Sequence, residues 1–264
     1  MSARLSEVLA SARADGDGLS VEVGDDWLQG RSLFGGMQAA IGLRAMRSSV
    51  PEALPLRTLQ VTFVGPVPAG PVRAVARVLR QGGSATIAEA RLVQGDETLA
   101  LLVGVFGKAR SSVVARALVQ PQLPAASPKT MPGVPGMTPS FMQHFRARWL
   151  RGGIPFSAST EPEASLELDL LDGAAGATEA HLVALADFPP PIALSMLRTP
   201  APGSSLTWML ELLADSYAAH ALERWRIDLE MPAARDGYTH QSGVLWAPDG
   251  SAAALSRQTM LVYG

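Results

Sequence analysis

The sequence predicts an α+β fold in which one unit, a helix followed by antiparallel strands, is used twice. A helical pattern followed by several strand patterns occurs in each half of the chain. The last hairpins of the two halves also align at a constant spacing of 154 residues, which pairs Gly83 with Gly237 and Leu101 with Leu255. Few residues are identical in this alignment, so the repeated order of elements carries most of the prediction.

The composition excludes several classes of protein. Of the 264 residues, 47% are hydrophobic and 17% charged, which is enough for a packed core. A net charge of −2 argues against a nucleic-acid or membrane partner, and the lack of cysteine excludes disulfides, thiolate metal sites and cysteine nucleophiles. The first residues lack the apolar core of a signal peptide, and no apolar run approaches the ~20 residues of a membrane span. We therefore expect a cytoplasmic protein.

In the first half, a weak alternation of apolar and polar residues predicts a strand at Leu19–Val23. The turn-rich run WLQGRSLFGG leads into Met37–Val50, whose apolar residues recur at helical spacing, and Pro51 ends this helix. Strands are then predicted at Leu59–Val64, Val72–Arg80, Thr86–Gln94 and Leu99–Phe106. The arginines of the second of these strands also fit a helical stripe, but its neighbours favour a strand.

A proline-rich segment separates the two halves. Between Val114 and Ser140 a proline occurs every few residues, with glycines in between, which is typical of a linker or a long crossing loop. We therefore divide the chain into a first half at 1–110, a linker at 111–138 and a second half at 139–264.

The second half begins with strand patterns at Phe141–Leu150 and Ser165–Leu171. An apolar run at Ala180–Ala186 ends at Asp187, and three prolines then lead into a short helix with the sequence IALSML. Further strands are predicted at Leu206–Leu213, Trp225–Glu230, Thr239–Trp246 and Ala252–Tyr263.

Four stretches carry a resemblance to a known family. Three lie in the first half, namely GRSLFGGMQAA (Gly30–Ala40), LRTLQVTFVGPV (Leu56–Val67) and VLRQGGSATIAEARLVQGDETLA (Val78–Ala100), and Ala234–Tyr263 ends the chain. Together they resemble the acyl-CoA thioesterase II-like family. The resemblance implies a double hotdog, in which two fused antiparallel sheets each wrap around a helix within one chain. It also implies a thioesterase whose substrate is an acyl-CoA.

The resemblance further implies which residues act on the substrate. The family's pattern is an aspartate near the second-half helix, a hydroxyl residue on the next strand and a glutamine on the last strand. It matches Asp187, Ser205 and Gln258. Because the stretch GSSLTW aligns loosely, Ser204 and Thr207 remain alternatives for the hydroxyl residue.

Thioester hydrolysis requires a positioned water, a group that raises its nucleophilicity, and donors for the developing oxyanion. Burial can make Asp187 a base, and the Gln258 amide can hold a water and donate to an oxygen. The backbone N–H groups where the first helix begins are natural donors to a thioester carbonyl. We therefore expect the substrate to bind at Phe34, Gly35, Gly36 and Met37.

The sequence indicates one site in each chain and no cofactor. Gly104 stands in the first half where Gln258 stands in the second, so the polar set occurs once. No phosphate-binding loop, dinucleotide fingerprint or nucleophile elbow is present. We expect no metal site, because the histidines have no ligand spacing; they are His144, His181, His220 and His240.

Other interpretations remain open. An aspartate before a proline-started helix is commonly its N-cap, a glutamine in a strand usually lies at the surface, and paired glycines usually form a turn. A non-catalytic acyl-CoA or acyl-chain binding protein on the same scaffold fits the sequence too. A hotdog dehydratase or hydratase is disfavoured, because no histidine lies near a predicted helix start. The acyl group cannot be read from the sequence, and edge strands allow a homodimer or a higher homo-oligomer.

Overall fold

In the computed structural model, which describes residues 2–124, 127–131, 136 and 138–264, each half contains a main helix followed by four long strands. The first half consists of α1 (Leu5–Ala10), β1 (Arg13–Asp15), β2 (Gly18–Val23), β3 (Leu28–Gln29), β4 (Ser32–Leu33), α2 (Gly35–Met46), β5 (Leu56–Phe63), β6 (Gly70–Gln81), β7 (Ala85–Gln94) and β8 (Glu97–Gly107). The second consists of β9 (Phe145–Arg151), β10 (Glu163–Leu170), α3 (Glu179–Asp187), α4 (Ile192–Met196), β11 (Gly203–Leu212), β12 (Trp225–Arg235), β13 (Tyr238–Trp246) and β14 (Ala252–Val262).

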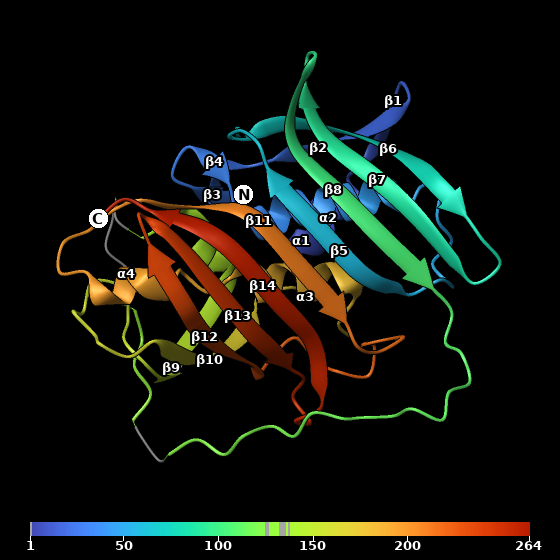
Figure 1. Ribbon diagram of the computed structural model, residues 1–264. Helices are drawn as coiled ribbons and strands as arrows, with labels where there is room; N and C mark the ends of the chain where they lie inside the picture. The colour runs from blue at the N-terminus through green and yellow to red at the C-terminus, as the bar shows by residue number, and fades with distance from the viewer. Residues whose placement is uncertain (1, 125–126, 132–135, 137) are drawn as a thin grey trace.

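The long strands form one continuous antiparallel sheet of twelve strands in the order β1-β2-β6-β7-β8-β5-β11-β14-β13-β12-β10-β9. The halves join where β5 pairs with β11, and Leu59 lies opposite Leu210 at this seam. Figure 1 shows these two strands side by side near the centre of the sheet. The order of strands on one side of the seam mirrors the order on the other, as the predicted duplication requires.

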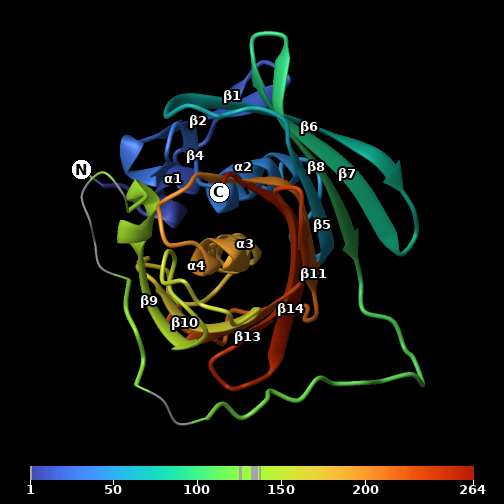
Figure 2. The ribbon, with the colours of Figure 1, turned by 60° about the vertical axis from the view of Figure 1, so that its left-hand side comes forward.

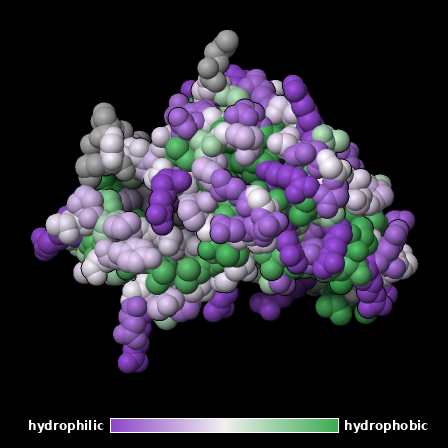
Figure 3. Space-filling model, turned by 90° about the horizontal axis from the view of Figure 1, so that it is seen from above, coloured by the Kyte–Doolittle hydropathy of each residue, from purple (hydrophilic) through white to green (hydrophobic). Residues whose placement is uncertain are grey.

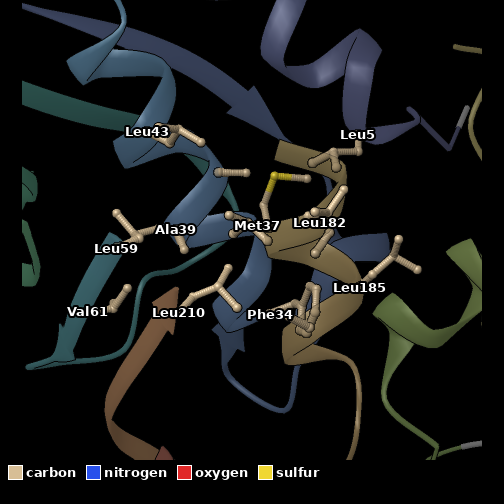
Figure 4. Packing of buried hydrophobic residues seen from close by; sticks show 14 of the residues in the cluster. Leu5, Phe34, Met37, Ala39, Leu43, Leu59, Val61, Leu182, Leu185 and Leu210 are labelled. Carbon is tan, nitrogen blue, oxygen red and sulfur yellow. The ribbon is translucent and has the colours of Figure 1, made fainter. Parts of the chain in front are cut away.

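The helices lie on the inner face of the sheet, which curves around them. In Figure 2 the strands of the second half wrap around α3 and α4, and α2 lies beside these helices, under the strands of the first half. Leu59 and Val61 of β5 and Leu210 of β11 alternate with exposed residues, so their side chains point inward to α2 (Figure 4). Burial of these apolar faces against the helices forms a single core shared by both halves.

The main helix of the second half differs from the prediction. The short helix after the prolines is present as α4, but the main helix is α3, which the apolar run before Asp187 forms and which ends at Asp187. The short helix α4 begins after Pro191, which is its N-cap residue. The alternative interpretation, in which Asp187 is the N-cap residue of that short helix, therefore does not hold. The apolar run Ala180–Ala186 is helical because it is buried between α2 and the sheet.

Other element boundaries also shift. Strand β9 begins at Phe145 rather than Phe141, because Ser140–His144 forms a 3₁₀ turn in which Phe141 stacks on Phe34 with ring centroids 4.1 Å apart. Helix α2 starts two residues earlier and ends four residues earlier than expected. The helix α1 had no signal that we recognised in the sequence.

The described residues between β8 and the turn at Ser140 form no helix or long strand. One isolated bridge joins Lys129 to Trp149 of the edge strand β9, and the segment runs along the outside of the second half (Figure 2). The division into two halves and a linker stays a prediction.

Hydrophilic side chains cover much of the face seen from above, with smaller hydrophobic areas between them (Figure 3). Within the described ranges, none of the helices has the length and apolar character needed to cross a membrane.

Candidate active site

Asp187 and Gln258, which are 71 positions apart in the chain, meet through a direct hydrogen bond. The Nε2 of Gln258 donates to the Oδ1 of Asp187 over 2.6 Å. Asp187 ends α3, and Gln258 points inward from β14, where only 5% of its surface is exposed. The expectation that a strand glutamine lies at the surface does not hold here.

The Asp187 carboxylate lies at the first turn of α2. Phe34 is the N-cap residue of α2, and it provides no side-chain cap for the exposed N–H groups of the first turn. The backbone N–H of Gly36 instead donates to Asp187. The carboxylate therefore caps a helix of the first half, and the positive end of that helix favours its ionised form.

At the start of α2, a side chain at Gly35 and a side chain at Gly36 would each be too close to different neighbours. A Cβ atom at Gly35 would lie 2.7 Å from Asp187 Oδ2, and one at Gly36 would lie 3.0 Å from the Cα of Ala184 on α3. Both distances are shorter than normal van der Waals contacts. Gly35 therefore leaves room for the carboxylate, and Gly36 allows α2 and α3 to approach each other closely.

Burial raises the pKa of Asp187 to about 7, against its ordinary value of 3.8. The hydrogen bonds from Gln258 and Gly36 act in the opposite direction, because they stabilise the ionised form. The residue as a whole is partly exposed. A carboxyl group with such a pKa can accept a proton and return it near neutral pH.

The three candidate hydroxyl residues lie on different faces of β11. Ser205 lies opposite Met260, a buried residue two positions after Gln258 on β14, so it belongs to the inner face. Ser204 and Thr207 are exposed. No hydrogen bond joins Ser205 to Asp187 or Gln258 in the described part of the chain.

The residues proposed to bind substrate at the start of α2 divide into two kinds. The side chains of Phe34 and Met37 are fully buried, and Phe34 stacks in an aromatic group with Phe141, Phe145 and Phe188. These two side chains therefore belong to the core. What the first turn of α2 offers to a ligand is its backbone N–H groups.

Sequence reasoning missed two polar residues on the inner face of β13. Gln241 lies opposite Gln258, is 4% exposed, and accepts a hydrogen bond from the Ile192 backbone N–H over 2.9 Å. Thr239 is 3% exposed, and its hydroxyl has no hydrogen-bond partner among the residues that the structure describes. The alternation of β13 could have revealed both, because each is separated by one residue from another inward position.

The equivalent place in the first half is closed. Gly104 occupies the position of Gln258, and a Cβ atom there would lie 2.8 Å from the Sδ of Met46, the last residue of α2. Beyond it, Arg47 pairs with Glu179 at the start of α3 over 2.5 Å and lies over the Phe106 ring at 4.5 Å. An ion pair and a thioether thus stand where the second half has a carboxylate and an amide.

One expectation about histidine is wrong. His181 lies in the first turn of α3, where its Nδ1 accepts a hydrogen bond from the Thr178 backbone N–H over 3.0 Å. It is buried at the opposite end of α3 from Asp187, so it acts as a structural cap and does not face that carboxylate. Among the described residues, no group of histidine and acidic side chains is arranged to hold a metal ion.

Two surface hollows of about 450 and 500 Å³ border β9 and the segment before it. Phe188 lines the first hollow, but neither Asp187 nor Gln258 lines either one. The hydrogen-bonded geometry around Asp187 defines the candidate site better than these hollows, because it brings a carboxyl group with a raised pKa together with amide donors.

Two family models match most of the chain. A model described as the acyl-CoA thioesterase N-terminal domain matches residues 23–107, and one described as the acyl-CoA thioesterase C-terminal domain matches residues 121–262. A search of curated proteins found no match.

Solved structures share the fold along the whole chain. A hot dog fold protein of unknown function from Alicyclobacillus acidocaldarius has 23% identity and a TM-score of 0.86, with 98% of each chain covered. A candidate thioesterase II from Thermobifida fusca YX has 19% identity and a TM-score of 0.81, with 99% of this chain and 98% of that chain covered. An acyl-CoA thioesterase II from Mycobacterium marinum has 15% identity and a TM-score of 0.71, with 98% of each covered. These similarities confirm the predicted α+β double hotdog.

The raised pKa of Asp187 predicts that Asp187→Asn stabilises the protein at high pH. Between pH 4 and pH 7 the folded state binds more protons at this carboxyl group than the unfolded chain does, so its contribution to stability falls as the pH rises. Asparagine keeps an acceptor for Gln258 without the charge. Urea unfolding should show the variant gaining on the order of 2–4 kcal/mol relative to wild type between pH 4 and pH 8. The exposed-turn substitution Asp96→Asn is the control, and equal pH dependence of Asp187→Asn and wild type would contradict the prediction.

Proposed function

Since the chain belongs to the acyl-CoA thioesterase family, we propose that it hydrolyses an acyl-CoA thioester to a free acid and CoA at the site around Asp187. The observation that carries the proposal is the hydrogen bond between Asp187 and Gln258 at the first turn of α2. It unites a carboxyl group with a pKa near 7, a side-chain amide and helix N–H donors at one point.

In this proposal the ionised Asp187 is the general base. It accepts a proton from a water molecule, whose oxygen attacks the carbonyl carbon of the thioester. The carbon–sulfur bond then breaks, and protonated Asp187 returns the proton to the leaving CoA thiolate. A pKa near 7 suits both steps, because the group neither holds nor releases its proton too strongly at neutral pH.

Gln258 and the first turn of α2 have supporting roles in the proposed reaction. The Gln258 amide orients Asp187 and carries an oxygen that can hold the attacking water. The first-turn N–H groups of Gly35 and Met37 have no intrahelical acceptor, so they can stabilise the oxyanion that forms on the carbonyl oxygen. The inward position of Ser205 makes it the hydroxyl residue that we include in the site.

Hydrolysis of a panel of acyl-CoA thioesters, followed by release of free CoA thiol, tests the proposal directly. We expect kcat/KM of the wild type to fall as the pH drops through about 7, where Asp187 becomes protonated. At pH 8, Asp187→Asn should lower turnover by about 10²–10⁴, as expected for loss of a general base. Binding of acyl-CoA by the wild type without turnover would instead indicate a non-catalytic binding protein.

Replacement of the amide should also be severe. We expect Gln258→Ala to lower kcat by roughly 10²–10³, the scale of losing one contact that stabilises the transition state. The matched control is Gln60→Ala, since Gln60 is exposed on β5 at the other face of the sheet. A loss of less than about threefold for Gln258→Ala would show that this glutamine is not positioned at the chemistry.

The three hydroxyl candidates can be separated by the face on which they lie. Ser205→Ala should reduce kcat about tenfold or more through loss of a polar contact. Ser204→Ala and Thr207→Ala should leave the kinetics unchanged, because both residues are exposed. If Thr207→Ala causes the larger loss, Thr207 is the hydroxyl residue of the site.

A further inference from the structure

The side chain of Phe63, at the end of β5 in the first half, lies next to the Asp187 carboxylate. A Cβ atom at Gly35 would lie 2.7 Å from Asp187 Oδ2 and 3.0 Å from the Cζ of Phe63. Since both atoms lie within 3.0 Å of one point, the ring edge and the carboxylate are close neighbours. The space beside Gly35 is therefore bordered by both the Asp187 carboxylate and the Phe63 ring.

Phe63 differs from the other aromatic residues near the site in its exposure. Phe34 and Phe188 flank the site in the sequence of α2 and α3, and both are at most 2% exposed within the aromatic core group. Phe63 is only partly buried and packs against the edge of the core. It ends β5, opposite the buried Ala100 of β8, so its ring faces inward at a point where the site approaches solvent.

The geometry of the proposed attack places the acyl group near this ring. A water held by Asp187 must lie about 3 Å from the thioester carbonyl carbon when it reacts. The first carbons of the acyl group are then within van der Waals reach of the groups around Gly35. On the α3 side the buried aromatic group leaves little freedom, whereas Phe63 stands at a strand end beside the exposed Val64.

We propose that Phe63 is a specificity-determining residue: its ring is the wall against which the acyl group lies, it limits the size of that group, and it keeps bulk water from Asp187. This inference rests on the proposed function. It adds a side chain to the backbone N–H groups of α2 as a contribution of the first half, which has no glutamine of its own at Gly104, to the reaction of the second.

The surroundings of Asp187 support the second role of this ring. Burial is the largest cause of its raised pKa, and the other causes are the neutral Gln258 amide and the Gly36 N–H. No charged side chain of the described residues contributes to the shift. Apolar neighbours such as Phe63 must therefore supply the desolvation, and removing the ring should admit water.

The test compares Phe63→Ala and the milder Phe63→Leu with wild type, and uses the exposed neighbour Val64→Ala as the control. For hydrolysis of butanoyl-, octanoyl- and hexadecanoyl-CoA, we expect Phe63→Ala to raise the ratio of kcat/KM for the longest to the shortest substrate at least tenfold. The acidic limb of its pH profile should move to lower pH, because Asp187 is better hydrated. Phe63→Leu should move both quantities in the same direction by less, and it serves if Phe63→Ala does not fold.

A second measurement does not depend on turnover. Titration of the ¹³C-labelled Asp187 carboxyl group, identified by its loss in Asp187→Asn, should show a lower pKa in Phe63→Ala than in wild type. Suppose that wild type hydrolyses the panel. If the chain-length ratios of kcat/KM and the acid dissociation constant of Asp187 then stay within twofold of wild type in both Phe63 variants, the inference is overturned. If wild type hydrolyses nothing, the proposed function fails. A lower Asp187 pKa in Phe63→Ala would then still support the role of Phe63 in keeping water from Asp187, and an unchanged pKa would refute that role.

Discussion

The carboxylate of Asp187 lies at the positive end of α2, and the arrangement of the site depends on this one contact. It requires a helix of the first half to begin with two glycines, a helix of the second half to end in an acid, and a strand glutamine to point inward. No single element satisfies these demands. They are met because the continuous sheet fixes both helices on the same concave face, where α2 and α3 pack directly against each other.

The contact has two opposing energetic effects. Capping of α2 favours the ionised carboxylate, whereas burial favours the neutral acid, and the two leave the group titrating near neutral pH. A purely structural cap would be better served by an exposed aspartate at the N-cap position itself, where desolvation is small. In the present arrangement, burial destabilises the ionised form of Asp187 at the pH at which the proposed reaction needs a base.

Much of the fold could be predicted from the sequence, because it depends on local patterns. The final hairpins of both halves have strong strand patterns, and β6, β7, β8, β13 and β14 lie within two residues of their expected bounds. Strand β12 begins where it was expected but extends to Arg235 and not only to Glu230. Helix α3 was missed as a helix because every residue of Ala180–Ala186 except His181 is apolar, so periodicity could not separate a buried helix from a buried strand. The start of β9 was misplaced because the position of Phe141 is determined by its long-range stacking contact with Phe34 and not by the strand pattern around it.

The site was harder to predict from the sequence than the fold, because its residues meet through tertiary packing. Resemblance pointed to Asp187 and Gln258, and the hydrogen bond between them is a feature of the structure that no spacing in the sequence encodes. Phe63, Thr239 and Gln241 carried no signal as single residues. The alternation of β13 marks Thr239 and Gln241 as residues of one face, but the structure is needed to show that this face, like that of Phe63 on β5, points inward.

The ion pair between Arg47 and Glu179 shows what two unequal repeats in one chain permit. In a dimer of identical subunits, every substitution appears in both copies, so neither copy can specialise alone. A tandem fusion removes that coupling and lets each repeat accumulate its own changes. One end of the helix pair can then hold the repeats together through an ion pair, while the other end holds a buried acid that a symmetric dimer would have to contain twice.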